Sequence, residues 1–442
     1  MNAGSAPRKW WHALSLEPVI HLSTFPNGLR VATAEMPHMT SVSVGLWVGV
    51  GSRYEPPRLN GVCHFIEHLL FKGTHKRSAR EISEAIEGIG GSLNAFTSEE
   101  ATCFHARACH DRFDSLLEVL MDMRHGSRFD PADIAKEREV IKEEMAMYFD
   151  EPQHLVQELL NATMWPGHPL GRSITGTNAT LDGMRREHLV GFLRENYRAG
   201  SSLVVAAGRV SHRHLLRVMK PCAKRWLAGP RPAFEPAAST QTAPRLQLVT
   251  RKTEQTQMAL GMRTCSRHDP RRYAVRLLNT ILGENMSSRL FQAVREDHGL
   301  TYSIYSTPSF FEDTGDIVIS AGLETEKLPR TLRLIFLELR QLAARAPSRL
   351  ELRRAQDYVL GQINLSLEST ESQMNWLGEQ LLGYGRTYSP AHHKRRILAV
   401  TGRDIQHAAR DFFRPERLSL SLVSPLKSDR QLRRLLNSAC EP

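Results

Sequence analysis

One stretch of this 442-residue chain reads Gly61-Val62-Cys63-His64-Phe65-Ile66-Glu67-His68-Leu69-Leu70-Phe71-Lys72-Gly73. Its apolar residues recur at helical spacing, at Val62, Phe65, Ile66, Leu69 and Leu70. Gly73, soon after the last of them, is typical of a helix C-terminus. The pattern predicts an amphipathic helix with one side packed in a core.

Two histidines on this predicted helix project from one face. His64 and His68 are four residues apart, so their imidazole rings are placed to hold one metal ion. Glu67 is their neighbour on the helix surface and would accept a proton from water at that ion. H-x-x-E-H is the inverted form of the zincin motif, although such a match arises by chance in about one chain in twenty of this composition. The motif therefore needs support from a third ligand.

A second predicted helix offers that ligand. A catalytic zinc site uses three protein ligands and keeps one position open for water. Residues 135–145 are rich in glutamate, and Glu137 and Glu144 share a face because they are two helical turns apart. Glu139 and Glu143 point elsewhere. The segment alone also fits a solvated helix held by Glu–Lys pairs, so both interpretations stay open.

The chain is duplicated in architecture. Residues 229–244 are rich in Pro, Ala, Ser and Thr without periodicity, which predicts a linker near the middle. On each side a strand, a helix, a break and a helix follow in the same order, offset by about 215 residues. In the first half these are Ala101–Ala108, Phe113–Met123, Phe129-Asp130-Pro131 and a helix through Met147; in the second they are Asp316–Gly322, Leu328–Leu342, Ala346-Pro347 and Leu350–Leu365.

Other segments have the alternation of strands. Every second residue of Val42–Val50 is apolar, which predicts a strand with one buried face. Ser202–Ala207 is a short apolar run, and Leu93–Ala108 has the pattern of a hairpin. Strands and helices interleave without a strict βαβ rhythm, which favours an α+β fold over a doubly wound sheet.

Composition and charge argue against several classes of protein. With 41% hydrophobic and 24% charged residues, the chain has the composition of an ordinary globular protein, not of a disordered or collagen-like one. The net charge of +11 is spread thinly, and its densest run, residues 392–396, comes with no nucleic-acid-binding motif. We therefore expect a solvated basic surface and no nucleic acid partner.

The sequence shows no membrane-spanning run, no secretory signal and no disulfide pattern. No run approaches the roughly 18 apolar residues of a membrane-spanning helix, and residues 1–15 hold no apolar signal core. We expect a cytoplasmic protein without membrane insertion, although an acid-free start leaves a targeting role for residues 1–18 open. The cysteines are too scattered for a disulfide scaffold: Cys63, Cys103, Cys109, Cys222, Cys265 and Cys440.

Five further segments of the chain match a known protein family, in the order in which that family has them. They are Phe71-Lys72-Gly73-Thr74, Gly90–Thr97, His168–Arg172, Leu278–Gly283 and Ser287–Phe291. Together with the H-x-x-E-H motif, and with Glu144 seventy-six residues after His68, they resemble the pitrilysin/insulinase superfamily of zinc peptidases. The resemblance runs from about Val19 to Leu426 and is strongest to the half-length branch similar to the mitochondrial processing peptidase.

The resemblance implies roles for the metal-site candidates. His64, His68 and Glu144 would bind one Zn²⁺ per chain. Glu67 would be the general base, and Glu137 would orient a ligand or support the base. The residue chemistry agrees, because zinc lowers the pKa of water to about 7 and a carboxylate can then remove its proton.

Two further pairs follow from the resemblance. Asn94 and Phe96 would lie on an edge strand that pairs with extended substrate. Arg295 and Tyr302 match the family's Arg/Tyr pair, in which Tyr donates a hydrogen bond to the oxyanion and Arg holds a substrate carbonyl. Taken without the family, Arg295 and Tyr302 would be read as structural, and the alternative for Asn94 and Phe96 is an ordinary hairpin strand. The sequence departs from the family pattern at one point. Residues 283–286 contain a single glycine, whereas the processing peptidase's non-catalytic subunit has a glycine-rich loop that helps to recognise presequences. This difference argues against presequence specificity.

The expected architecture is a clamshell of two duplicated α/β-sandwich halves. Its boundaries are an extension at 1–18, a zinc-binding catalytic domain at 19–228, the linker at 229–244 and a substrate-chamber domain at 245–442. The expected function is that of a zinc metalloendopeptidase acting on short or unfolded peptides bound as an extended strand in a closed chamber. One chain carries both the zinc set and the Arg/Tyr pair, which favours a homodimer over a heterodimer with a related subunit.

Two alternatives to general peptide cleavage stay open. The first is a dedicated maturation protease for one cognate precursor or leader peptide. The second is a non-catalytic assembly subunit, which predicts eroded ligands. None of His64, Glu67, His68 or Glu144 is missing, and this disfavours the second alternative.

Overall fold

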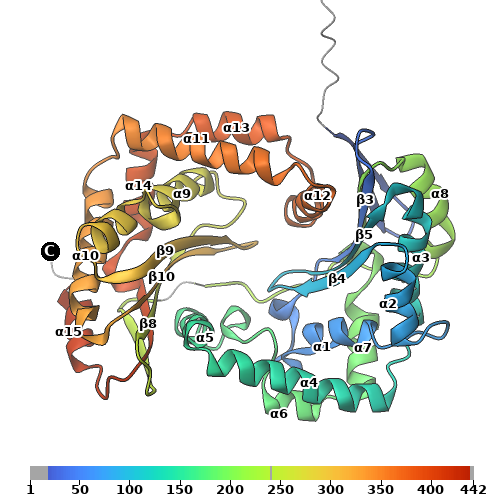
Figure 1. Cartoon of the computed structure of the whole chain (residues 1–442), viewed down its shortest axis with the longest axis horizontal. Helices are drawn as coiled ribbons and strands as arrows, with labels where there is room; N and C mark the ends of the chain where they lie inside the picture. Colours follow the sequence, from blue (N-terminus) through green and yellow to red (C-terminus); the bar gives the residue numbers. More distant parts are fainter. Residues whose placement is uncertain (1–17, 239–240, 439–442) are drawn as a thin grey trace, which may run out of the picture.

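The protein consists of two similar α/β halves that face each other across a central space. The computed structural model describes residues 18–238 and 241–438, so most of the predicted extension and Cys440 lie outside the described residues. Residues 229–238 and 241–244 between the halves form no helix or strand. In Figure 1 the N-terminal half lies on the right and the C-terminal half on the left.

The N-terminal half is built on a six-stranded sheet of order β1-β2-β6-β3-β5-β4. Its strands are β1 (Val19–Thr24), β2 (Arg30–Glu35), β3 (Ser41–Val48), β4 (Ser92–Thr97), β5 (Thr102–Cys109) and β6 (Ser202–Gly208). Its helices are α1 (Val62–Leu70), α2 (Ala79–Glu87), α3 (Phe113–Gly126), α4 (Pro131–Asp150), α5 (Pro152–Met164), α6 (Asn178–Gly183), α7 (Arg186–Asn196) and α8 (His212–Ala223).

The C-terminal half repeats the plan with a five-stranded sheet of order β7-β11-β8-β10-β9. Its strands are β7 (Arg245–Thr250), β8 (Thr256–Thr264), β9 (Thr301–Phe310), β10 (Gly315–Leu323) and β11 (Leu418–Ser424). Its helices are α9 (Arg272–Asn279), α10 (Leu328–Ala344), α11 (Arg349–Ser366), α12 (Thr370–Tyr384), α13 (Pro390–Leu398), α14 (Gly402–Phe412) and α15 (Arg430–Ser438).

The two sheets confirm the duplication. In each sheet the last strand of the half pairs in parallel with a strand from its start, β6 with β2 and β11 with β7, while the remaining pairs are antiparallel. Corresponding strands begin about 215 residues apart, as Ser41 of β3 and Thr256 of β8 illustrate. The one addition is β1, an extra strand at the outer edge of the first sheet. The α+β fold with two duplicated halves is therefore confirmed.

One helix of each half packs on the sheet of the other half. Helix α12 packs on β3 and β6 of the N-terminal sheet, while α5 packs on β8 and β11 of the C-terminal sheet (Figure 1). The expectation of a single buried face on β3 is wrong for this reason. Trp47 is 1% exposed because it lies under Met374 and Leu377 of α12, opposite the face that packs on the helices of its own half.

Substituting Gly378 by Ala should weaken the packing of α12 on the N-terminal sheet. A Cβ at Gly378 would lie 2.3 Å from Cε2 of the Trp47 indole, so α12 would have to move off the sheet. We expect the free energy of unfolding to fall by about 1–3 kcal/mol, measured by denaturant titration. Gly361→Ala in α11 is the matched control, because nothing lies within 4 Å of its Cβ and the change should be stabilising or neutral. Equal effects of the two variants would contradict the prediction.

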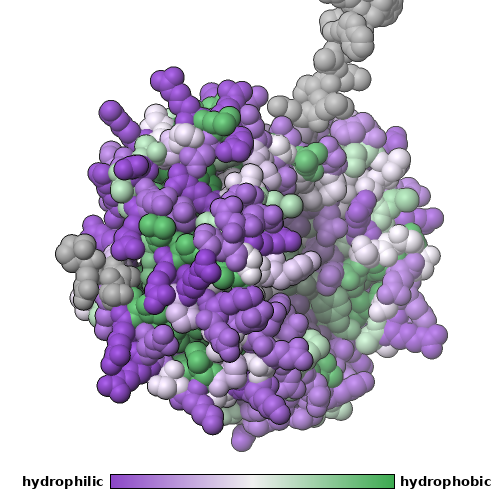
Figure 2. Space-filling view, turned by 60° about the vertical axis from the view of Figure 1, so that its left-hand side comes forward, coloured by the Kyte–Doolittle hydropathy of each residue, from purple (hydrophilic) through white to green (hydrophobic). Residues whose placement is uncertain are grey.

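Three further findings concern the cysteines, the length of the helices and the surface. The five described cysteines are free, and Cys63, Cys103 and Cys265 are buried. Among the described helices, none is both long and apolar enough to cross a membrane. The face shown in Figure 2 is mostly hydrophilic and is hollowed between the two halves, where apolar side chains show on the wall of the hollow.

Candidate active site

The metal-ligand candidates from the two predicted helices meet at one point. His64 and His68 lie on α1, and Glu144 lies on α4, which packs against α1. The Nε2 atoms of the two histidines are 3.8 and 3.5 Å from Glu144 Oε2. One ligand atom from each side chain lies within 4.8 Å of the others, and within the described part of the chain this is the one such group.

Both histidines have Nε2 near Glu144, and at His68 a neighbouring carboxylate accounts for this. His68 Nδ1 lies 3.3 Å from Glu137 Oε2 and donates to it, so its Nε2 faces Glu144. Glu137 is 1% exposed and pairs through Oε1 with Lys72 Nζ at 2.9 Å, which fixes the carboxylate. His64 Nδ1 is buried without a hydrogen-bond partner among the described residues. Two Nε2 atoms and one carboxylate oxygen therefore converge, a donor set that fits Zn²⁺.

The protonation of the three candidate ligands is set by burial and by their mutual hydrogen bonds. Burial lowers the pKa of His64 to about 4, so this ring is neutral at physiological pH. Burial opposes a charge on His68 as well, but hydrogen bonds to Glu144 and Glu137 raise the pKa of His68 above its ordinary value. The hydrogen bond with His68 in turn lowers the pKa of Glu144, which stays ionised.

The candidate base lies between the metal ligands and an edge strand. Glu67 follows His64 by three residues on α1, and its Oε2 accepts a hydrogen bond from the Thr97 hydroxyl of β4 at 2.5 Å. Burial raises the pKa of the Glu67 carboxyl, and the Thr97 hydrogen bond offsets part of that rise. Glu67 is therefore a carboxylate of increased basicity at the metal cluster.

Strand β4 carries the two substrate-binding candidates. It forms the edge of the first sheet opposite β1, and within the described residues it pairs with β5 alone. Asn94 is exposed, and Phe96 packs edge-on against Trp47 with ring centroids 5.5 Å apart. Both side chains lie on the opposite face of the strand from Thr97. An extended peptide added to this edge would run past Glu67.

Arg295 and Tyr302 lie together but away from this cluster. The Arg295 guanidinium carbon is 5.1 Å from the centre of the Tyr302 ring, which is 81% exposed. Tyr302 is near the start of β9, whereas the turn after β9 reaches the N-terminal half through Asp313, bonded to Arg53. Eight residues of strand, about 26 Å, separate Tyr302 from Phe310 at the end of β9. Arg295 and Tyr302 thus lie against each other and away from the metal cluster of the same chain.

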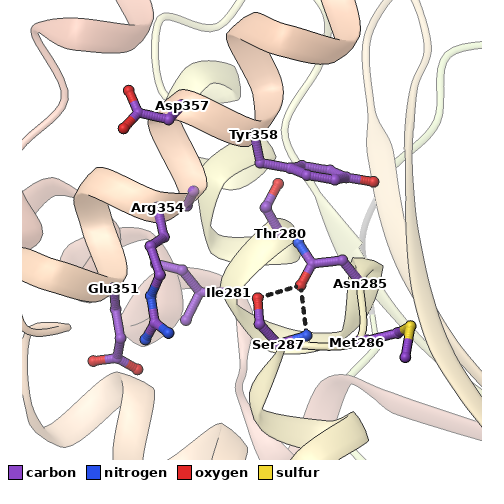
Figure 3. A pocket seen from close by; sticks show the side chains of 10 residues that line it. Thr280, Ile281, Asn285, Met286, Ser287, Glu351, Arg354, Asp357 and Tyr358 are labelled. Atoms are coloured by element: carbon purple, nitrogen blue, oxygen red, sulfur yellow. Dashed lines mark hydrogen bonds between the residues drawn. The ribbon is translucent and has the colours of Figure 1, made fainter.

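A second concave feature lies in the C-terminal half. A cavity of about 560 Å³ opens between α11 and the loop that contains the single glycine of residues 283–286 (Figure 3). Asn285 closes this loop, since its Oδ1 accepts hydrogen bonds from the Ser287 amide at 3.1 Å and the Ser287 hydroxyl at 2.8 Å. None of the candidate site residues lines this cavity.

Known proteins match this chain over most of its length. The model of the insulinase family, peptidase family M16, matches residues 30–178, and that of the peptidase M16 inactive domain matches residues 183–359. An uncharacterized zinc protease of Streptomyces coelicolor is 40% identical over 422 residues, covering 94% of this chain and 92% of its own length. This chain belongs to the M16 peptidase family.

Other M16 relatives extend the comparison. The uncharacterized zinc protease YmxG of Bacillus subtilis is 36% identical, covering 91% of this chain and 97% of its own. A crystal structure of a protease from Helicobacter pylori matches with a TM-score of 0.86 at 20% identity, over 92% of this chain and 100% of that chain. At that identity the last match concerns the fold alone.

Three side chains in this M16 site were not singled out from the sequence. Tyr148 hydrogen-bonds Glu144 and lies four residues after it, so helical spacing could have identified it. Lys72 lies four residues after His68 and pairs with Glu137, a relation that the same spacing makes possible. Thr97 had no local signal, because its contact with Glu67 depends on how β4 packs on α1.

Proposed function

We propose that this M16 peptidase is a zinc metalloendopeptidase that hydrolyses short or unfolded peptides bound as an extended strand. Zinc is supported by the names of the relatives and by the donor set of His64, His68 and Glu144, which would hold one ion per chain. The observation that carries the proposal is the hydrogen bond from Thr97 to Glu67. It places the base against the strand whose free edge would bind the peptide backbone.

Each residue then has a chemical task. When bound, zinc supplies a Lewis acid that polarises a carbonyl and makes water acidic near neutral pH. Thr97 occupies one oxygen of Glu67, so Oε1 receives the proton of the attacking water and later delivers it to the leaving amine. Glu137 holds His68 in the tautomer that presents Nε2. Backbone pairing along β4 demands little of the substrate sequence, and the hollow between the halves favours unfolded segments over folded proteins.

The Arg/Tyr pair completes the site from a second copy of the chain. In one chain Tyr302 is exposed and lies near the start of β9, about 26 Å of strand from the end of β9 next to the N-terminal half, so we assign it no role at the metal cluster of its own chain. A homodimer that turns the two hollows toward each other would bring Arg295 and Tyr302 of one protomer to the metal cluster of its partner. There Tyr302 would donate to the developing oxyanion and Arg295 would hold a substrate carbonyl.

Digestion of a mixture of unstructured peptides, followed by mass spectrometry, tests the proposal. We expect internal cleavage that a chelator stops and that one equivalent of Zn²⁺ per chain restores. Cleavage confined to a single precursor would favour the dedicated maturation protease. A chain that binds zinc in equal amount yet cuts no peptide would overturn the general peptidase.

Zinc binding should release about one proton per chain at pH 5.5. The raised pKa of His68 means that this ring carries a proton there, whereas His64, with a pKa of about 4, and the ionised Glu144 do not compete. Affinity should therefore fall about tenfold per pH unit as the pH drops below the pKa of His68. Calorimetric titration in two buffers of different ionisation enthalpy counts the protons, and a value near two would contradict this assignment.

A further inference from the structure

The helix that carries both histidines begins inside the core, at a residue that has no side chain to cap it. Gly61 has φ of 94°, and a Cβ there would lie 2.6 Å from the Thr175 carbonyl oxygen. The close approach of that backbone therefore requires glycine. Val62 and Cys63, the first two residues of α1, are 0% exposed, so water does not reach the amides at this end.

A carboxylate from a preceding turn supplies the missing cap. Glu55 is 3% exposed, and its Oε2 accepts hydrogen bonds from the Gly61 amide at 2.7 Å and from Asn60 Nδ2 at 2.9 Å. Its Oε1 accepts from the Cys63 amide at 2.8 Å. The helix dipole favours a negative charge at this position, whereas burial raises the pKa of the Glu55 carboxyl to about 7. The next residue along the helix is His64.

Glu55 is itself held from several sides. Its carbonyl oxygen accepts a hydrogen bond from Arg172 Nη1 at 2.9 Å. The turn before it is bonded to the β4–β5 connection, where the Arg53 amide donates to the Glu99 carbonyl at 2.9 Å. The buried Arg53 guanidinium pairs with Glu100 at 2.8 Å and with Asp313 of the other half at 2.7 Å. The carboxylate is therefore a fixed point against which α1 is placed.

We infer that Glu55 is a positioning residue for the metal site, acting through the first turn of α1 on His64. His64 follows directly on the bonded Cys63 amide, and its own Nδ1 has no hydrogen-bond partner among the described residues. Its ring therefore lacks a counterpart of the hydrogen bond that His68 donates to Glu137. The direction of His64 Nε2 then depends on where the helix backbone starts, which Glu55 determines.

Zinc affinity of the full-length chain tests this role. Glu55→Gln keeps the size of the side chain but turns an NH₂ group toward one of the two helix amides, so the first turn must shift. We expect the zinc Kd, measured by competition with a chelating dye, to rise about tenfold or more. The visible absorption spectrum of the Co²⁺-loaded protein should change as well, because it reports ligand geometry. Asp122→Asn is the control: this carboxylate of the same half is 7% exposed but bonds Thr74 and Arg77 instead of α1, and the variant should keep the wild-type Kd and spectrum.

The outcomes separate this inference from the proposed function on which it rests. Failure of the wild-type chain to bind zinc would overturn the proposed function. Tight binding by wild type with an unchanged Kd and cobalt spectrum in Glu55→Gln would overturn the positioning role alone. If Glu55→Gln does not fold, Glu55→Asp keeps the charge and reaches fewer amides; a loss of affinity would support the inference, and wild-type affinity would contradict it.

Discussion

Replacing Glu67 by Gln should reduce the rate of peptide cleavage about a thousandfold, which is the range that a lost general base accounts for. Gln has the shape of Glu but cannot take a proton, and its amide can still accept the hydrogen bond from Thr97. The three metal-binding side chains are untouched, so zinc content should stay at the wild-type level. Cleavage of a fluorogenic peptide and elemental analysis of the same sample measure both quantities.

A second glutamate provides the control for this variant. Glu143 lies on α4 next to Glu144, but its side chain is exposed and points away from the cluster. Glu143→Gln makes the same chemical change close to the site and should leave both activity and zinc content unchanged. A Glu67→Gln protein that keeps a tenth or more of the wild-type rate would show that another group removes the proton.

Much of this site could be predicted because its signals are local. His64, Glu67 and His68 share a helix, so their spacing alone places them on neighbouring positions of one face, and α1 indeed spans Val62–Leu70. The same applies to Glu137 and Glu144 on α4, which both reach His68. The duplication was also visible, because each half repeats its strands and helices at a constant offset.

What could not be predicted depends on contacts between distant segments. The apolar positions of α12 fit packing within its own half, and nothing local indicates that Met374 would cover Trp47 of the other half. Glu55 precedes the motif by nine residues in a turn without periodicity, and its role arises from the backbone of Thr175, which excludes a side chain at Gly61. The separation of Tyr302 from the metal cluster depends in the same way on tertiary structure, because β9 reaches the N-terminal half at its C-terminal end and Tyr302 lies near its start.

Mixed dimers should reveal that Tyr302 serves the partner's metal cluster. Tyr302→Phe removes the hydroxyl that would donate to the oxyanion, and loss of one such donor lowers kcat about 10²–10³-fold. The exposed ring makes no buried contact that the change would disturb, so the fold should be retained. We expect the homodimeric variant to bind zinc normally and to cleave slowly, as Glu67→Gln does.

Two tagged chains, expressed together and purified through both tags, then distinguish the arrangements. When one chain carries Glu67→Gln and the other Tyr302→Phe, sharing between chains leaves one intact site of two and about half of the wild-type activity. When one chain carries both substitutions and the other is wild type, sharing leaves no intact site. The metal cluster with an intact Glu67 then belongs to the wild-type chain and is paired with the substituted Tyr302 position of the other chain. Sites confined to single chains give the reverse: almost no activity in the first dimer and half in the second. The homodimer proposal thus depends on which of two dimers with the same mutations is active.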